Sequence, residues 1–224
     1  MRIFINLLIL FFVTCPFVYS ETQVSGTIDQ DTTWTINESP YVVTSDIKIQ
    51  SSTETETAIL TIEPGVEVRF MQNTGLYIGE SYNGILIAKG TKDLPIIFTT
   101  NSSYLVNWKG IYFKNKADDE QSNMENCLIE YAGHDAESAS IICDVPISIK
   151  NCTIQKSNGF PIKVPSNNIK ISNLHYKDNK VQATWLSGDI SENTTWGNNG
   201  DESTYLIREN LHVEYSSSSG IALM

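Results

Sequence analysis

From Tyr41 onward the chain consists of short apolar runs in which apolar and polar positions alternate. β-Branched and aromatic residues dominate these runs, and Gly, Asn, Asp, Ser or Pro bounds each of them. Alternation with a period of two is typical of half-buried strands. The sequence therefore predicts an all-β protein with no helix after its N-terminal segment. The predicted strands include 41–43, 59–62, 66–70, 84–88, 95–100, 110–113, 126–131, 147–154, 160–164 and 169–176.

A short repeat favours one all-β architecture over another. Asn126-Cys127, Asn151-Cys152 and Asn173-Leu174 each precede an apolar run, and they lie 25 and then 22 residues apart. A period of this size is one turn of a solenoid, in which equivalent residues of successive coils stack. We therefore expect a parallel β-helix with a structural ladder of Asn126, Asn151 and Asn173, whose amides bond to one another inside a tight bend. A sandwich with Asn at its turns is the alternative.

A long repeat divides the chain into modules. Residues 24–34 return as 186–196, each ending in Thr-Thr-Trp, and after a two-residue insertion Tyr41-Val42-Val43 is answered by Tyr205-Leu206-Ile207. These matches predict one module over 21–180 and the start of a second, truncated copy over 181–224. Because the last residues are apolar rather than a polar cap, we expect either a longer multi-module protein or a last coil that pairs with another chain.

The first twenty residues have the pattern of a cleaved signal peptide. Arg2 precedes the apolar run 3–13, and small residues end the segment at Ser20. Cys15 offers a lipoprotein alternative, which the residues before it do not favour. Later apolar runs are too short to span a membrane. We therefore expect a secreted or cell-surface protein that is not inserted in a membrane after cleavage.

The charge and the cysteine content of the chain argue against some classes of partner and against a disulfide framework. The 224 residues carry a formal net charge of -11, which repels nucleic acid and anionic lipid. Cleavage of residues 1–20 would leave Cys127, Cys143 and Cys152, an odd number that allows one disulfide at most. We expect these cysteines to be small buried apolar residues.

Several motifs follow one another in a recognisable order. These are 60–70, which contains Pro64-Gly65, then 84–91, 95–99 and 108–113. In this order the chain resembles the secreted right-handed parallel β-helix proteins of the pectate-lyase-like superfamily, particularly the repeat modules of large bacterial surface and extracellular proteins. The resemblance covers about 24–176 and restarts near Val181. It implies a right-handed parallel β-helix, but the superfamily includes lyases, hydrolases, adhesins and structural stalks.

Candidate ligand-binding residues are few. Two loop segments, 118–120 and 133–137, contribute carboxylates and a histidine that would face one ligand if the loops stack, and Ca²⁺ or a sugar hydroxyl would suit them. Tyr77 and two other loop tyrosines are candidates for exposed stacking. Exposed loop tips are the ordinary interpretation of the acidic residues. The candidate ligand-binding residues are Asp118, Asp119, Glu120, His134, Asp135, Glu137, Tyr82 and Tyr104.

Two functional hypotheses follow. The first is a non-catalytic extracellular or cell-surface module for adhesion, which binds a glycan or a surface protein. The second is a polysaccharide lyase or glycoside hydrolase. The hydrolases that the chain resembles carry paired Asp residues, a Gly-His-Gly stretch and an Arg-x-Lys strand, which this sequence lacks. No basic residue near the acidic loop in sequence suggests a proton acceptor, so we assign no catalytic residue, metal site or obligatory cofactor.

Overall fold

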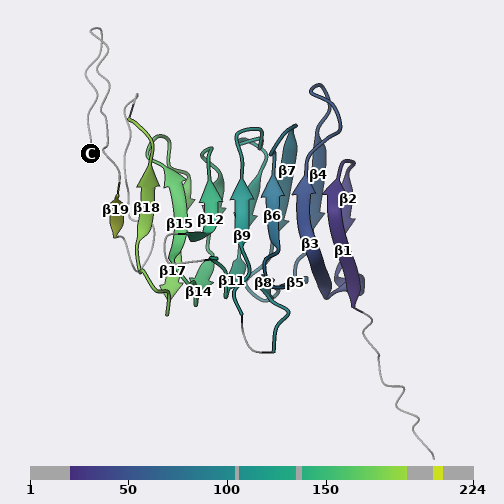
Figure 1. The fold of residues 1–224 in the computed structure, drawn as a ribbon, viewed down its shortest axis with the longest axis horizontal. Coiled ribbons are helices and arrows are strands. Elements are labelled where there is room, and N and C mark those ends of the chain that lie inside the picture. The colour runs from purple at the N-terminus through teal and green to yellow at the C-terminus, as the bar shows by residue number, and fades with distance from the viewer. Residues whose placement is uncertain (1–20, 104–105, 135–137, 191–203, 209–224) are drawn as a thin grey trace, which may run out of the picture.

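The computed structural model describes residues 21–103, 106–134, 138–190 and 204–208, which form an all-β structure (Figure 1). Among these residues, the one helical element is a single 3₁₀ turn, Ile36–Glu38, and every strand pairing is parallel. No helix in this part of the chain has the length and apolar character needed to cross a membrane.

The strands form a coil with three faces. Two faces belong to one 13-stranded sheet that bends within β3 (Tyr41–Ile49), and the third is a 6-stranded sheet. Beyond β3, the first face contains β5 (Glu67–Phe70), β8 (Ile96–Thr100), β11 (Cys127–Glu130), β14 (Thr153–Gln155) and β17 (His175–Lys177). The second face contains β6 (Gly75–Ile78), β9 (Gly110–Phe113), β12 (Ala139–Cys143), β15 (Phe160–Pro165), β18 (Thr184–Ser187) and β19 (Tyr205–Ile207). The third face contains β2 (Thr32–Trp34), β4 (Ala58–Ile62), β7 (Gly84–Lys89), β10 (Asn123–Glu125), β13 (Ser148–Lys150) and β16 (Ile171–Ser172).

This arrangement is the predicted parallel β-helix. On the first face Leu128 pairs with Thr153, and Thr153 pairs with His175, so neighbouring strands are separated by the repeat spacing seen in the sequence. Figure 1 shows the coils following one another from β1 (Thr22–Ile28) at one end to β19 at the other. The sandwich alternative is wrong, because sandwiches are built from antiparallel sheets.

Alternate residues of each strand point into the coil and form one continuous core. Phe70 and Trp108 stack inside it with ring centroids 3.9 Å apart, and Trp34 stacks on Tyr41. Cys127, Cys143 and Cys152 are buried and free, as the sequence predicts. Burial raises the pKa of the Cys127 and Cys143 thiols, which keeps them neutral and apolar.

The predicted asparagine ladder forms the corner between the third and first faces. Asn126, Asn151 and Asn173 each have positive φ (49°, 54° and 51°), a conformation that asparagine tolerates better than most residues. The side-chain amide of Asn173 donates to Oδ1 of Asn151 at 2.8 Å, whereas Asn151 donates to Glu125 at 3.4 Å and Asn126 to the Gly90 carbonyl at 3.1 Å. The ladder is therefore partial. Asn151 and Asn173 are exposed, so these amides line the outside of the bend rather than its interior.

Two segments of the long repeat pair with each other as strands in both copies. Thr22 and Val24 pair with Tyr41 and Val43, and their counterparts Thr184 and Leu186 pair with Tyr205 and Ile207. The two pairs lie on different faces, because Tyr41–Val43 stacks on β5 whereas β18 stacks on β15. The predicted signal peptide and most of the second copy lie outside the described residues.

We predict that Asn151→Ala destabilises the protein by about 1–2 kcal/mol, because alanine is strained at positive φ and cannot bond to Asn173. Asn151→Gly removes the strain and should cost less. Chemical denaturation of both variants measures the difference. Asn115→Ala, at an exposed position with ordinary φ, is the matched control. Equal stability of Asn151→Ala and the parent protein would contradict this account of the corner.

Candidate functional site

Asp118 organises the acidic loop between β9 and β10. Its Oδ1 accepts hydrogen bonds from the backbone N–H groups of Glu120 at 3.0 Å and Gln121 at 2.8 Å, and its Oδ2 accepts one from the Gln121 side chain at 2.8 Å. Burial raises the pKa of Asp118, but these bonds and the charge of Lys170 outweigh it and hold the pKa below its usual value. Both carboxylate oxygens of Asp118 are therefore engaged within its own loop.

Lys170 pairs with the other two carboxylates of this loop. Its Nζ lies 3.0 Å from Oε1 of Glu120, 3.5 Å from Oδ2 of Asp119 and 3.1 Å from the Asp119 carbonyl oxygen. Burial lowers the pKa of Lys170, but Glu120 and Asp119 outweigh it and raise the pKa. Lys170 thus carries its proton near neutrality. Sequence reasoning missed this residue because it lies 50 residues from Glu120 and only coil stacking brings the two together.

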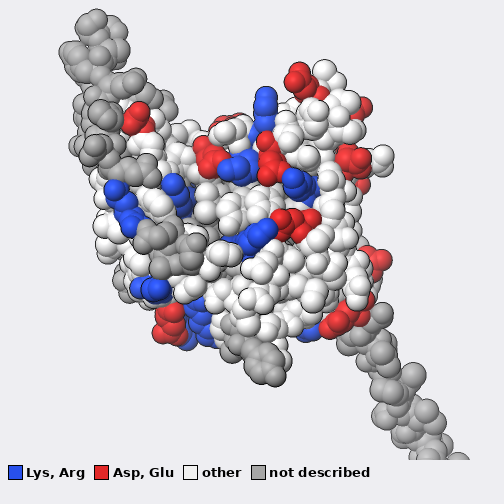
Figure 2. All heavy atoms as spheres, viewed as in Figure 1, with Lys and Arg blue, Asp and Glu red and all other residues white. Residues whose placement is uncertain are grey.

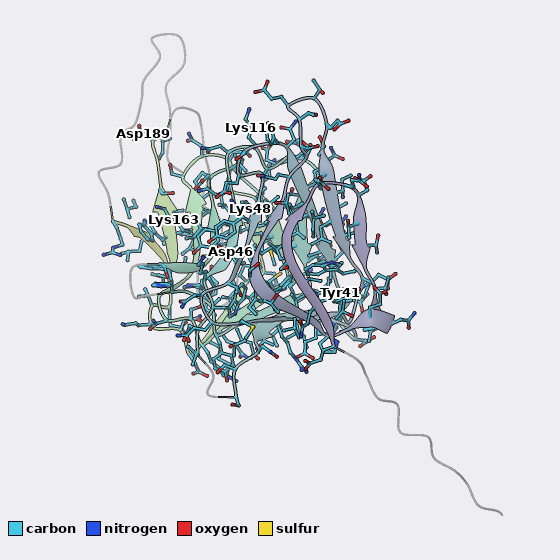
Figure 3. All side chains as sticks on the ribbon, turned by 45° about the vertical axis from the view of Figure 1, so that its right-hand side comes forward. Tyr41, Asp46, Lys48, Lys116, Lys163 and Asp189 are labelled. Carbon is cyan, nitrogen blue, oxygen red and sulfur yellow. The ribbon has the colours of Figure 1, made fainter. Side chains whose placement is uncertain are left out.

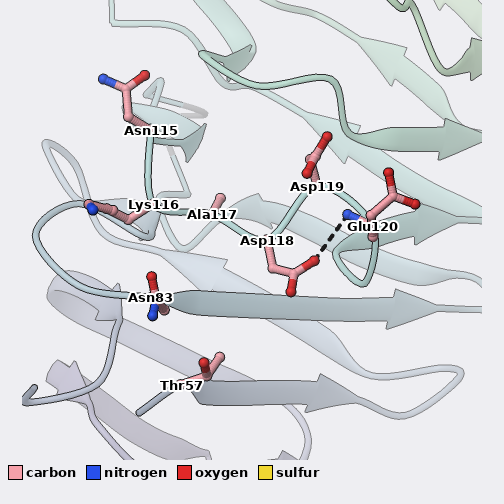
Figure 4. Close-up of a pocket in the computed structure, with 8 residues that line it drawn as sticks. All are labelled: Thr57, Asn83, Asn115, Lys116, Ala117, Asp118, Asp119 and Glu120. Atoms are coloured by element: carbon pink, nitrogen blue, oxygen red, sulfur yellow. Dashed lines mark hydrogen bonds between the residues drawn. The ribbon is translucent and has the colours of Figure 1, made fainter. Parts of the chain in front are cut away.

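A polar depression of about 450 Å³ adjoins this loop (Figure 4). It lies at the corner between the second and third faces, and its lining residues are Thr57, Asn83 and 115–120. The described residues contain no group of three or more His, Cys, Asp or Glu side chains able to hold a metal ion. A Ca²⁺ ion at this depression would therefore need backbone or amide oxygens in addition to Asp119 and Glu120.

The remaining predicted site residues do not gather at this depression. His134 is exposed in the connection between β11 and β12, at the corner between the first and second faces. His134 and the acidic loop do not stack on each other, because the two loops leave different corners of the coil. Tyr82 lies beside Asn83 at the corner of the acidic loop, and Asp135, Glu137 and Tyr104 lie outside the described residues.

A row of outward side chains crosses the second face instead, and we call it the lateral strip. Its members occupy paired positions on neighbouring strands, so the row runs across the strands and along the helix axis. All of them are partly exposed. The lateral strip consists of Lys48, Tyr77, Tyr112, Ile142, Lys163 and Trp185.

Tyr77 and Tyr112 form the aromatic centre of the lateral strip. Their ring centroids are 4.7 Å apart and the ring planes differ by 10°. Both rings lean toward the residues that precede them in their strands. Tyr77 Cε2 lies 3.2 Å from the position that a Cβ on Gly75 would occupy, and the Tyr112 hydroxyl donates to the Lys109 carbonyl at 3.3 Å. Burial, with the carboxylates of Asp46 and Glu80, raises the pKa of Tyr77 to about 12. Tyr77 is therefore neutral at physiological pH.

Ion pairs border these tyrosines on both sides. Lys109 Nζ contacts both carboxylate oxygens of Asp46 at 3.0 and 2.7 Å. The other two pairs are Lys48–Glu80 and Lys114–Asp144. Figure 2 shows acidic and basic side chains alternating around an uncharged area in the middle of this face.

Trp185 marks the other half of the lateral strip. Lys163 Nζ lies 4.1 Å from the Trp185 ring centroid, and the Arg208 guanidinium lies 5.3 Å from it. Such cation–π contacts orient the charged groups over the ring. Asp46, Lys48 and Lys163 are labelled in Figure 3.

Sequence reasoning found only Tyr77 among these residues. The members of the lateral strip are far apart in the chain, and their alignment depends on strand register. One signal was present in the sequence: Gly75-Leu76-Tyr77 and Gly110-Ile111-Tyr112 share a Gly-x-Tyr pattern.

We predict a pH-dependent role for Asp118 in loop stability. Asp118→Ala should destabilise the protein by about 1 kcal/mol at pH 7, because two backbone N–H groups lose their acceptor. Since folding lowers the pKa of Asp118, its contribution is present above the unfolded pKa of about 3.9 and lost as pH falls through the folded value. Thermal denaturation from pH 7 to pH 3 tests this, with Asn115→Ala as control. A deficit that persists undiminished at pH 3 would contradict the role of the carboxylate.

The comparisons with known proteins agree with the fold. The family model described as "Pectate-lyase like beta helix domain" matches residues 26–145, more than half of the chain. Neither the curated proteins nor the solved structures gave a match. Coil architecture and family match lead to one conclusion: the chain belongs to the pectate-lyase-like β-helix domain family.

Proposed function

We propose that this protein is a non-catalytic extracellular or cell-surface module that binds a glycan through the lateral strip. The observation that carries the proposal is the stacked pair Tyr77–Tyr112, held on a regular sheet and bordered by ion pairs. Because the two rings stack on each other, they offer their edges and hydroxyl groups to a sugar, and the fixed polar groups beside them orient its hydroxyls. Because the strip lies on strands rather than on loops, its geometry is rigid without the ligand.

The carboxylates of the acidic loop are already engaged in hydrogen bonds and ion pairs, which favours a binding function over a catalytic one. Asp118 accepts hydrogen bonds from its own loop, and Asp119 and Glu120 both pair with the ammonium group of Lys170. A lysine whose pKa is raised by two carboxylates is a poor proton acceptor. Glycoside hydrolysis also needs one carboxyl group free to protonate the leaving group and a second that acts on the sugar.

Extracellular placement and tandem repetition belong to the same proposal. The N-terminal pattern of residues 1–20 supports export, and the return of residues 24–34 as 186–196 supports a second copy from about Val181. Tandem copies of a binding module multiply affinity when several engage one polymer.

Polysaccharide cleavage is the second candidate, and one observation favours it. Lys170 places a basic residue within 3.5 Å of the carboxylates of Asp119 and Glu120. Incubation with uronate-containing and neutral polysaccharides, with and without Ca²⁺, tests this candidate. Release of reducing or unsaturated ends that disappears in Lys170→Met would establish cleavage and overturn the non-catalytic proposal.

We predict that the double variant Tyr77→Ala/Tyr112→Ala loses polysaccharide binding by on the order of tenfold or more, because both aromatic anchors are removed. Tyr82→Ala, a tyrosine at the corner of the acidic loop, is the matched control and should bind like the parent. Affinity electrophoresis in polysaccharide-containing gels measures the change, and circular dichroism verifies folding. Loss of binding in Tyr82→Ala but not in the double variant would move the site to the loops.

A further inference from the structure

The strand β1, at one end of the coil in Figure 1, has a counterpart inside the chain, which is β18. Each of the two strands pairs on one edge with the next strand of its own copy, β3 for β1 and β19 for β18. The N–H of Thr22 donates to the Pro40 carbonyl at 3.0 Å. In the second copy, the N–H of Thr184 donates to the Thr204 carbonyl at 2.9 Å. The repeat is therefore one of backbone pairing as well as of sequence.

The other edge of β18 is covered by β15. The two strands pair in parallel register, with Val164 opposite Leu186, and Leu186 is fully buried. The residue that follows β15 adds two bonds. The N–H of Ser166 donates to the Ser187 carbonyl at 2.8 Å, and its hydroxyl donates to the Gly188 carbonyl at 2.9 Å. This edge is therefore where one coil of the β-helix docks on the next.

The corresponding edge of β1 carries no strand among the residues that the structure describes, since β1 pairs with β3 alone. Val24 is the counterpart of Leu186 and packs against the core, but it is only partly buried. Ser25 and Gly26 are exposed, and their carbonyls correspond to the two that accept from Ser166. The outer edge of β1 thus presents the backbone groups and the apolar surface that β15 covers on β18.

The sequence of β1 does not protect this edge against pairing. Charged side chains and proline are common devices that keep edge strands from pairing, and residues 22–28 contain neither. The pairing of β1 with β3 shifts register between Val24 and Gly26. The counterpart Gly188 has nearly the same φ as Gly26, 81° against 84°, and β15 still pairs with β18 as far as Ser187. The bend in β1 is therefore compatible with a further strand.

We propose that the outer edge of β1 is a docking edge for the end coil of another β-helix module, which binds through a parallel strand with the pattern of residues 160–166. This strand pairs opposite residues 22–25 as β15 pairs opposite residues 184–187, and it covers Val24. Because β1 begins on the first face whereas β18 lies on the second, the docked module is rotated by one face about the helix axis. The inference does not depend on glycan binding by the lateral strip.

A synthetic peptide of residues 159–168, titrated into the full chain, tests the docking edge. The peptide supplies the β15 strand together with Ser166. Amide nuclear magnetic resonance spectra of the isotope-labelled chain report where it binds. We expect saturable shifts at β1 and the adjoining part of β3, with a Kd on the order of 1 mM or tighter. A control peptide with Ile162→Lys and Val164→Lys puts charges at the inward positions and should not bind.

The variant Gln23→Pro separates edge pairing from folding. Since Thr22 directs its N–H to β3, the N–H of the next residue points to the outer edge, and proline is tolerated at such an edge position. Gln23→Pro should weaken peptide binding by about tenfold or more with an unchanged circular dichroism spectrum, whereas Gln23→Ala should stay within about twofold of the parent. Absence of saturable binding to the parent chain, shifts confined to other strands, or binding that survives Gln23→Pro would overturn the proposal.

Discussion

The structure depends on the in-register stacking of successive coils, and the coil corners make that register possible. At the corner after the third face, one residue with positive φ turns the chain, and the N–H groups of Asn126 and Asn151 donate to the carbonyls of Lys150 and Ser172 in the next coil. A one-residue turn leaves no slack through which a strand could slip. A slip by one residue would move every inward side chain to the outside, so the core and the outer rows are fixed together.

This constraint explains how much the sequence could predict. Asn126, Asn151 and Asn173 carry a local signal, since a left-handed one-residue turn restricts the residue type, and their spacing gave the coil length and the parallel β-helix. The rows of outward-facing strand residues, such as the lateral strip, have no comparable restriction on residue type. Tyr112 and Ile142 become neighbours only through the pairing of β9 with β12, and the loop insertions between them vary in length. Sequence spacing alone therefore found the corners but not the lateral strip.

The same reasoning explains why the predicted loop site failed to assemble. The convergence of Asp118–Glu120 with His134 required their two loops to stack on each other. In a three-sided coil, however, segments about 15 residues apart lie at different corners, whereas Lys170 returns to the corner of Glu120 after two further coils. Spatial neighbours in a solenoid are separated by whole coils. A search for functional residues at multiples of the coil length would have paired Lys170 with the acidic loop.

The two surfaces also differ in how they use their charges. In the acidic loop, hydrogen bonds and Lys170 hold carboxylates that would otherwise repel one another, so the charged groups stabilise the loop. On the lateral strip, the Lys114–Asp144 pair connects the ends of the neighbouring strands β9 and β12, and Lys109, which pairs with Asp46, lies over the Tyr77 ring at 5.8 Å from its centroid. Exposed pairs of this kind add little stability. Their consistent effect is to place donors and acceptors at fixed positions beside an apolar row, which is the property that a binding surface requires.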